Sequence, residues 1–196
     1  MIRVGIIIGS TRPGRLGEGV AHWVYDIARA RKDAVFEIVD LNDYRLPHLD
    51  EPLPPSMGQY TQAHTRAWSE KIASLDAFVF VTPEYNHSTS GVLKNAIDYL
   101  YHEWNNKAAG FVSYGSAGGV RAVENLRLVM GELQVADVRA QVSFSLFTDF
   151  ENFRSFRPDP SKETALGTML DQLVAWGTAL RPLRARPVAP VVAAAA

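Results

Sequence analysis

Hydroxyl and guanidinium side chains gather in a glycine-rich stretch near the start of the chain. The stretch G-S-T-R-P-G-R-L-G-E covers residues 9–18, follows an apolar run and precedes a helical pattern. Unpaired amides at a helix N-terminus, the helix dipole, the hydroxyls of Ser10 and Thr11 and the guanidinium groups of Arg12 and Arg15 would together bind a phosphate. The sequence predicts an anion site here, and the alternative is a tight turn with solvated arginines.

Two common nucleotide motifs are excluded in this stretch. The dinucleotide fingerprint G-x-G-x-x-G is absent. Gly9 and Gly14 have the spacing of a P-loop, but Arg15 and Leu16 stand where that motif needs Lys and Ser or Thr. Without the lysine and the magnesium-binding hydroxyl, nucleotide hydrolysis is not expected.

Two further loops carry residues suited to a flat ligand. Residues 82–91 read T-P-E-Y-N-H-S-T-S-G, in which Tyr85 offers an aromatic face while Asn86 and Gly91 tolerate unusual backbone angles. Residues 113–119 read S-Y-G-S-A-G-G, and these glycines permit a close approach of backbone to a ligand. The alternatives are an ordinary loop whose tyrosine covers the core, and a flexible turn.

An alternation of strands and helices must position these loops. Apolar runs of strand length cover 2–8, 35–39, 77–82, 108–114 and 138–147. Helical periodicity begins at 18, covers 59–74, follows Ser90, spans 123–133 and returns after Ser161, an expected N-cap. Residues 41–55 are rich in Pro, Asp and Asn and are expected to form a loop. The pattern predicts an α/β fold with a doubly wound, mainly parallel sheet, whose ligands bind at the carboxyl ends of the strands.

Composition narrows the class of protein. The 196 residues suffice for one domain, expected over residues 1–181, with a flexible Pro/Ala-rich tail at 182–196. A formal net charge of -1 does not favour a nucleic-acid partner. The chain has no cysteine, which fits a reducing compartment, and residues 1–8 are too short to span a membrane and lack the features of a leader. We expect a cytoplasmic protein without a membrane partner.

Taken in order, the three loops resemble the NADPH-dependent FMN reductase family. The block P-E-Y-N-H-S-T-S-G-V-L-K-N-A-I-D at residues 83–98 is specific, and the loops at 9–18 and 113–119 support it by order and spacing. The resemblance extends from the first strand to about the fifth. It implies a flavodoxin-like three-layer sandwich, a five-stranded parallel sheet in the order 2-1-3-4-5, and a non-covalent FMN.

The resemblance also implies a set of site residues. In that family the first loop binds the FMN phosphate, the P-E-Y-N loop borders the isoalloxazine ring, and the glycine loop closes its other edge. The residues implied to bind FMN are Ser10, Arg12, Arg15, Leu16, Gly17, Glu18, Pro83, Glu84, Tyr85, Asn86, Ser113, Gly115 and Gly118. Two positions depart from the family pattern: Arg15 stands where many members have Ser, and Ser90 stands where Pro is frequent and could cap the next helix.

The implied activity is that of an oxidoreductase. It would pass reducing equivalents from NADPH or NADH through FMN to a small acceptor such as free flavin, a quinone, an azo dye, a metal oxyanion or oxygen. FMN carries this chemistry, so no catalytic acid–base residue and no metal site are expected. Arg15 and Arg121 are candidates to bind the 2′-phosphate of NADPH. The alternatives are a flavodoxin-type electron carrier, which the near-neutral charge disfavours, and a phosphate-binding regulatory domain without redox chemistry.

The remaining polar and aromatic residues suggest no further chemistry. The five histidines have no metal-ligand spacing, Asp76, Glu84 and Asp98 form no obvious carboxylate pair, and Lys94 is expected at the surface or a subunit contact. An aromatic repeat precedes the last helix at Phe147, Phe150, Phe153 and Phe156. It could form a small satellite core, or an aromatic lid or subunit contact beside the flavin. We favour a subunit contact, because the family resemblance implies a homodimer or homotetramer whose flavin sites lie near the interfaces.

Overall fold

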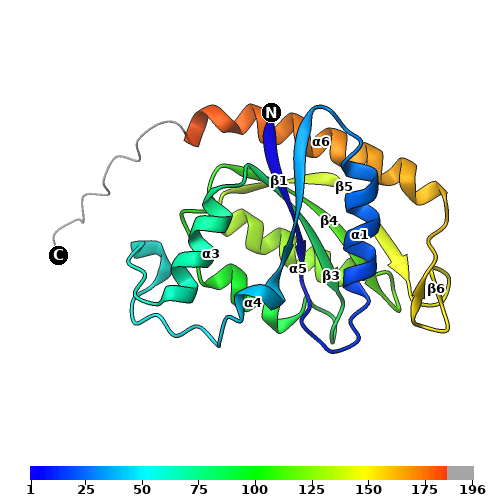
Figure 1. Ribbon diagram of the computed structural model, residues 1–196, viewed down its shortest axis with the longest axis horizontal. Coiled ribbons are helices and arrows are strands. Elements are labelled where there is room, and N and C mark those ends of the chain that lie inside the picture. The colour runs from blue at the N-terminus through cyan, green and yellow to red at the C-terminus, as the bar shows by residue number, and fades with distance from the viewer. Residues whose placement is uncertain (185–196) are drawn as a thin grey trace.

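The apolar runs form the strands of one parallel sheet. The structure is a computed structural model that describes residues 1–184. The strands are β1 (Ile2–Ile8), β2 (Ala34–Asp40), β3 (Ala77–Pro83), β4 (Lys107–Gly115) and β5 (Val135–Ser145). Their order is β2-β1-β3-β4-β5, and every residue of β3 and β4 is buried. Figure 1 shows the sheet with its helices. The flavodoxin-like fold and the predicted strand order are therefore confirmed.

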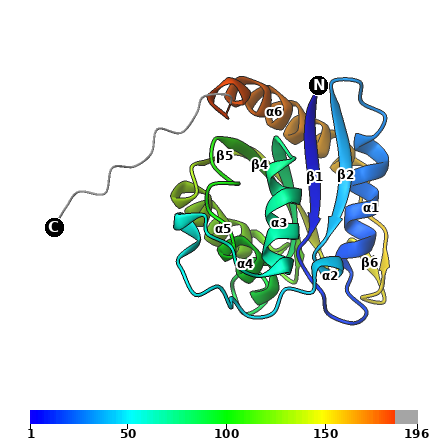
Figure 2. The same cartoon turned by 60° about the vertical axis from the view of Figure 1, so that its left-hand side comes forward.

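Two helical layers cover the sheet, one on each face (Figure 2). The longer helices are α1 (Gly17–Ala28), α3 (Ala63–Ala73), α4 (Gly91–Asp98), α5 (Val120–Glu132) and α6 (Ser161–Arg184). Apolar residues of α1 and α6 pack against one face of the sheet, while α3, α4 and α5 pack against the other. Alternation along β1 supplies both cores, since Ile6 and Ile8 join the first and Ile7 joins the second. None of the helices within residues 1–184 is long and apolar enough to span a membrane.

The segment after β2 differs from the sequence prediction. Residues 41–55 are not a loop throughout: α2 (Leu41–Tyr44) begins directly after β2, because the Asp40 carboxylate accepts the amide of Asn42 at 2.9 Å. A short 3₁₀ turn, η1 (Pro55–Met57), follows. Helix α3 begins at Ala63 rather than at 59, because the Glu51 carboxylate accepts the amides of Thr61 and Gln62 at 2.8 and 3.0 Å and holds that backbone outside the helix.

The ends of α6 also differ from the prediction. Ser161 is not the N-cap but the first helical residue, and the Asp159 carboxylate accepts its amide at 2.8 Å. The helix continues through Pro182 to Arg184, past the boundary expected at 181. The Arg184 guanidinium donates to the carbonyl of Asn106 at 2.6 Å and pairs with Asp76, which fixes the last turn. The expected tail otherwise lies outside the described residues.

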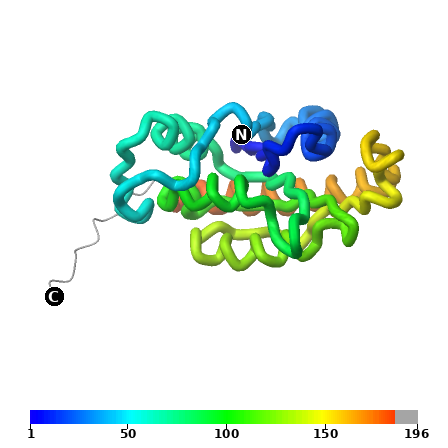
Figure 3. The backbone as a smooth tube through the Cα atoms, turned by 90° about the horizontal axis from the view of Figure 1, so that it is seen from below, coloured from blue at the N-terminus to red at the C-terminus, as the bar shows by residue number. Residues whose placement is uncertain are grey.

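The aromatic repeat divides between core and surface. A small hairpin of β6 (Phe150–Glu151) and β7 (Ser155–Phe156) lies beside α1, away from residues 41–62, when the molecule is seen from the carboxyl ends of the strands (Figure 3). Phe150 and Phe156 pack into the core on the α1 side of the sheet. Phe147 and Phe153 are exposed and touch each other edge to face, with ring centres 5.7 Å apart. The first pair therefore belongs to the main core and not to a separate satellite core, and a subunit contact stays a prediction for the second pair.

Candidate functional site

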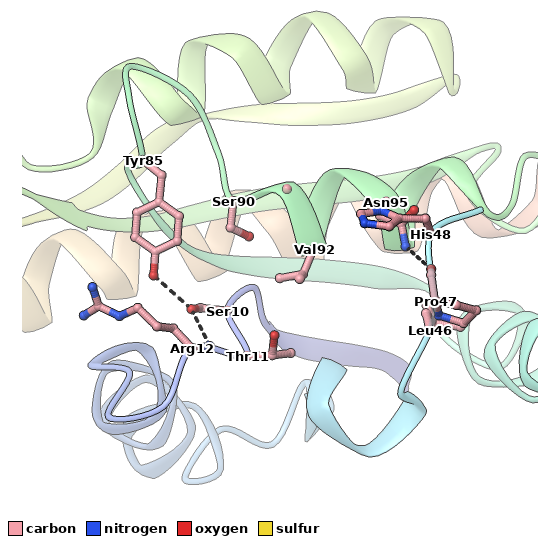
Figure 4. A pocket seen from close by; sticks show the side chains of 11 residues that line it. Ser10, Thr11, Arg12, Leu46, Pro47, His48, Tyr85, Ser90, Val92 and Asn95 are labelled. Carbon is pink, nitrogen blue, oxygen red and sulfur yellow. Dashed lines mark hydrogen bonds between the residues drawn. The ribbon is translucent and has the colours of Figure 1, made fainter. Parts of the chain in front are cut away.

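A cavity of about 510 Å³ lies at the carboxyl ends of β1 and β3. This volume is within the range of cofactor sites, and the carboxyl edge is where open α/β sheets bind ligands. The side chains converge from the loop after β1, the turn after β3, the start of α4 and the segment after α2 (Figure 4). The lining residues are Ser10, Thr11, Arg12, Leu46, Pro47, His48, Tyr85, Ser90, Gly91, Val92 and Asn95.

The loop after β1 leaves hydrogen-bond donors facing this cavity. Ser10 is buried, and its hydroxyl lies 3.2 Å from that of Tyr85. The guanidinium carbon of exposed Arg12 lies 5.8 Å from the centre of the Tyr85 ring, and no carboxylate within residues 1–184 pairs with Arg12. Across the same described range, the amide of Thr11 donates to no protein acceptor. Three predicted site residues, Ser10, Arg12 and Tyr85, are thus brought together.

Arg15, predicted to bind the FMN phosphate, has protein partners in this structure. Its guanidinium donates to the Asp40 carboxylate and, at 2.8 Å, to the carbonyl of Ser10. Hydrogen bonding to Asp40 raises the pKa of Arg15. Its side chain is only 11% exposed, and its bonds to Asp40 and Ser10 brace the loop. Binding of the FMN phosphate or of the NADPH 2′-phosphate by Arg15 stays a prediction. Sequence reasoning missed Asp40 as the partner.

The other predicted residues of this loop surround the start of α1. Leu16 packs against the apolar core, Gly17 begins the helix, and the exposed side chain of Glu18 lies 3.6 Å from Arg15. The hydroxyl of Tyr114, at the end of β4, is buried beside Gly17 and has no hydrogen-bond partner within the described chain. Burial raises the pKa of Tyr114, so its hydroxyl stays protonated.

The turn after β3 presents Tyr85 to the cavity. Tyr85 and Ser88 exchange two backbone hydrogen bonds of 2.9 and 3.2 Å, and Asn86 has the left-handed backbone expected of it, with a φ of 47°. Gly91 was expected to tolerate unusual backbone angles, but it begins α4 and does not use that freedom. Ser90 caps that helix as predicted: its hydroxyl accepts the amide of Leu93 at 3.2 Å and donates to the carbonyl of Gly9. The cap therefore joins the first and third strand ends.

Glu84 links the turn to the glycine loop. Its side chain is 4% exposed, pairs with the Arg121 guanidinium and accepts the Arg121 amide at 3.2 Å. The Glu84 amide donates to the carbonyl of Tyr114 at 3.0 Å. Glu84 thus holds two loops together and does not line the cavity. Arg121, predicted as a candidate for the NADPH phosphate, is already paired.

The glycine loop is built for tight local packing. Gly118 and Gly119 have φ values of 73° and 75°, and a Cβ on Gly119 would lie 2.7 Å from the backbone nitrogen of Tyr114. The buried Ser113 hydroxyl donates to the carbonyl of Gly118 at 2.8 Å. The predicted residues that do not line the cavity are Arg15, Leu16, Gly17, Glu18, Pro83, Glu84, Asn86, Ser113, Gly115 and Gly118.

Sequence reasoning missed the outer half of the cavity. Leu46, Pro47 and His48 come from the segment treated as a plain loop, and Val92 and Asn95 from α4. Asn95 belongs to the family block at residues 83–98, but its sequence position alone indicates no role. Its amide contacts the backbone of the segment, a relation between distant residues that spacing does not reveal.

The donor set fits FMN. Within residues 1–184, the Ser10 and Thr11 hydroxyls, the unpaired Arg12 guanidinium and the unpaired Thr11 amide suit a phosphate. A tyrosine ring at the same cavity suits a flat heterocycle. The buried Tyr114 hydroxyl beside Gly17 has no hydrogen-bond partner within residues 1–184, and a ligand at the start of α1 would satisfy it.

Comparison with known proteins agrees with this geometry. The family model for NADPH-dependent FMN reductase matches residues 2–149. The chain is 40% identical to an NAD(P)H-dependent FMN reductase of Nectria sp, over 76% of this chain and 79% of that protein. It is 46% identical to an NAD(P)H-dependent FMN reductase of Schizosaccharomyces pombe, over 68% of each chain.

A solved structure shows the same fold. The flavoenzyme NAD(P)H:(acceptor) oxidoreductase FerB from Paracoccus denitrificans superposes with a TM-score of 0.71 at 21% identity, covering 91% of this chain and 98% of its own. The sheet order, the loop block at 83–98 and the family match lead to one assignment. The chain belongs to the NADPH-dependent FMN reductase family.

Proposed function

We propose that the chain binds FMN non-covalently and passes reducing equivalents from NADPH or NADH to a small acceptor. The observation that carries this proposal is the set of free donors from Ser10, Thr11 and Arg12 at the β1–α1 junction, next to Tyr85. These residues would hold the phosphate end. Tyr85 and the neighbouring glycine loop would border the ring end, and Asn86 and Gly115 would supply backbone there.

Bound FMN supplies the hydride-accepting ring, and the protein supplies orientation and exclusion of competing groups. Arg15 fixes the phosphate loop through Asp40, and Glu84 fixes the ring-side loops through Arg121. The outer half of the cavity leaves space for the nicotinamide and then for the acceptor, so the two would enter in turn.

Nearby carboxylates are already paired, which supports a site without a protein acid or base. Glu84 pairs with Arg121, and Asp98 pairs with Lys94 at 2.6 Å. The proposed hydride transfer needs none of these groups.

The proposed assembly is a homodimer or homotetramer in the cytoplasm. Exposed Phe147 and Phe153, together with exposed Leu49, Leu53 and Met57 in the segment after α2, are apolar surface that a second copy could cover. Sedimentation of the full chain tests the assembly, and a monomer at all concentrations would contradict it.

Anaerobic reduction separates the enzyme from the electron carrier. The protein is loaded with FMN, freed of unbound flavin and mixed with NADPH or NADH, and bleaching of the flavin absorbance is followed. We expect bleaching within the time of mixing and recovery of the colour when free flavin or a quinone is added. The flavodoxin-type carrier would be favoured if neither NADPH nor NADH reduced the bound FMN while a separate reductase did.

A further inference from the structure

The outer wall of the cavity is a chain segment without regular secondary structure. Leu46, Pro47 and His48 face the cavity and lie between α2 and η1, in a stretch that belongs to no strand or helix. Such a segment would sample several conformations unless other elements held its backbone. The position of this wall therefore depends on the contacts that the segment makes.

Asn95 of α4 holds this backbone with both ends of its amide. Its Nδ2 donates to the carbonyl of Pro47 at 2.7 Å, and its Oδ1 accepts the amide of Leu49 at 3.0 Å. The side chain therefore pairs with the segment as a neighbouring strand would. No shorter or acidic side chain keeps both bonds, because one end must donate and the other must accept.

Tyr99, one turn further along the chain, fixes the same segment. Its hydroxyl lies 3.1 Å from the carbonyl of Pro47 and 2.9 Å from the Asp50 carboxylate. Asp50 also lies 3.0 Å from Nε2 of His64 on α3, and this contact lowers the pKa of Asp50. Burial, followed by the bond to Asp50, raises the pKa of Tyr99 to about 12, so the hydroxyl remains a donor.

We propose that Asn95 and Tyr99 are positioning residues: they fix residues 46–48, which form the wall of the outer half of the cavity. The inference rests on the proposed function, because it assigns that half to the nicotinamide and the acceptor. The two residues act through residues 46–49 and contact the cofactor loop at neither Ser10 nor Arg12. Their loss should weaken substrate binding while FMN binding stays intact.

The test uses the FMN-loaded full chain and the substitution Asn95→Asp. The matched control is Asn105→Asp: Asn105 also bonds two backbone carbonyls through Nδ2, at 2.8 and 3.1 Å, but lies at the opposite end of the sheet. Tyr99→Phe removes only a hydroxyl and serves as a second variant that keeps the ring. The readouts are KM and kcat for NADPH and a quinone, the Kd for FMN, and amide hydrogen exchange of residues 46–53.

We expect Asn95→Asp to raise KM about tenfold and to accelerate exchange of the Leu49 amide about tenfold, with kcat and the FMN Kd unchanged within about twofold. Tyr99→Phe should change the same quantities less, and Asn105→Asp should change none of them. Equal KM values for the wild type and both cavity variants would overturn this inference alone. A wild-type chain that binds no FMN would overturn the proposed function and the inference with it.

Discussion

Two arginines that stand three residues apart have different surroundings. Arg12 faces the cavity without a carboxylate partner within residues 1–184, whereas Arg15 is held by Asp40. The sequence indicates that the guanidinium groups of this loop pair with an anion, but it does not indicate whether that anion is a ligand phosphate or a protein carboxylate. Asp40 comes beside the loop only because Ile8 and Asp40 pair in the parallel register of β1 and β2. That register is a property of the folded sheet, so Arg15 could not be assigned from spacing.

At the residue scale, the pairing of Arg15 predicts a coupling that a free phosphate ligand would lack. In flavin-free protein, Arg15→Met and Asp40→Asn should each destabilise the fold, and the double variant should cost less than the sum. We expect a coupling of about 1–3 kcal/mol from urea unfolding, because each single change leaves one half-buried partner alone. Additive losses, together with an FMN affinity that depends on Arg15 but not on Asp40, would show that Arg15 binds the phosphate directly.

Elements buried on both faces were the most predictable. The runs that became β1, β3 and β4 are almost wholly apolar, and their predicted bounds differ from the observed ones by one residue at most at either end. The start of α3 was not predictable, because Glu51 captures the amides of Thr61 and Gln62 from another part of the chain. Helix α2 was hidden in a segment rich in turn formers.

At the element scale, the junction of β4 and α3 predicts a pH dependence of stability. Lys107 begins β4, is 3% exposed, and its Nζ donates to the carbonyl of Ile72 at 2.6 Å, at the end of α3. Burial lowers the pKa of Lys107 to about 7, from an ordinary value of 10.5. Between these two values the unfolded chain binds a proton that the folded chain does not. The free energy of unfolding should therefore rise with pH over that interval.

Chemical unfolding of the wild type and Lys107→Met at a series of pH values tests this linkage. The free energy of unfolding of Lys107→Met should not show this increase with pH. Between about pH 7 and pH 10 the wild type should therefore gain a few kcal/mol of stability relative to the variant. Lys32→Met, at an exposed position, is the control and should keep the wild-type slope. A parallel pH dependence for the wild type and Lys107→Met would contradict the assignment.

At the scale of the whole molecule, the sheet order places the cavity. Strand β1 lies between β2 and β3, so the connection after β1 crosses to β2 on one side and the connection after β3 crosses to β4 on the other. Between these two connections the edge is open where the first loop and Tyr85 meet. The sequence predicted this inner half, since Ser10, Arg12 and Tyr85 belong to loops that follow recognisable strands. It did not predict the outer half, because His48 and Asn95 come together only through the folded arrangement of α4 and the segment after α2.

The central claim is that the loop after β1 binds the phosphate of FMN. Its most direct test is fluorescence titration of flavin-free protein with FMN and with riboflavin, which has the same ring but no phosphate. Arg12→Ala is compared with Arg139→Ala, an exposed arginine on β5. We expect the wild type and Arg139→Ala to prefer FMN, and Arg12→Ala to bind FMN about 10- to 100-fold more weakly with riboflavin affinity unchanged. Equal affinity of the wild type for FMN and riboflavin, or an equal loss in both variants, would contradict the account.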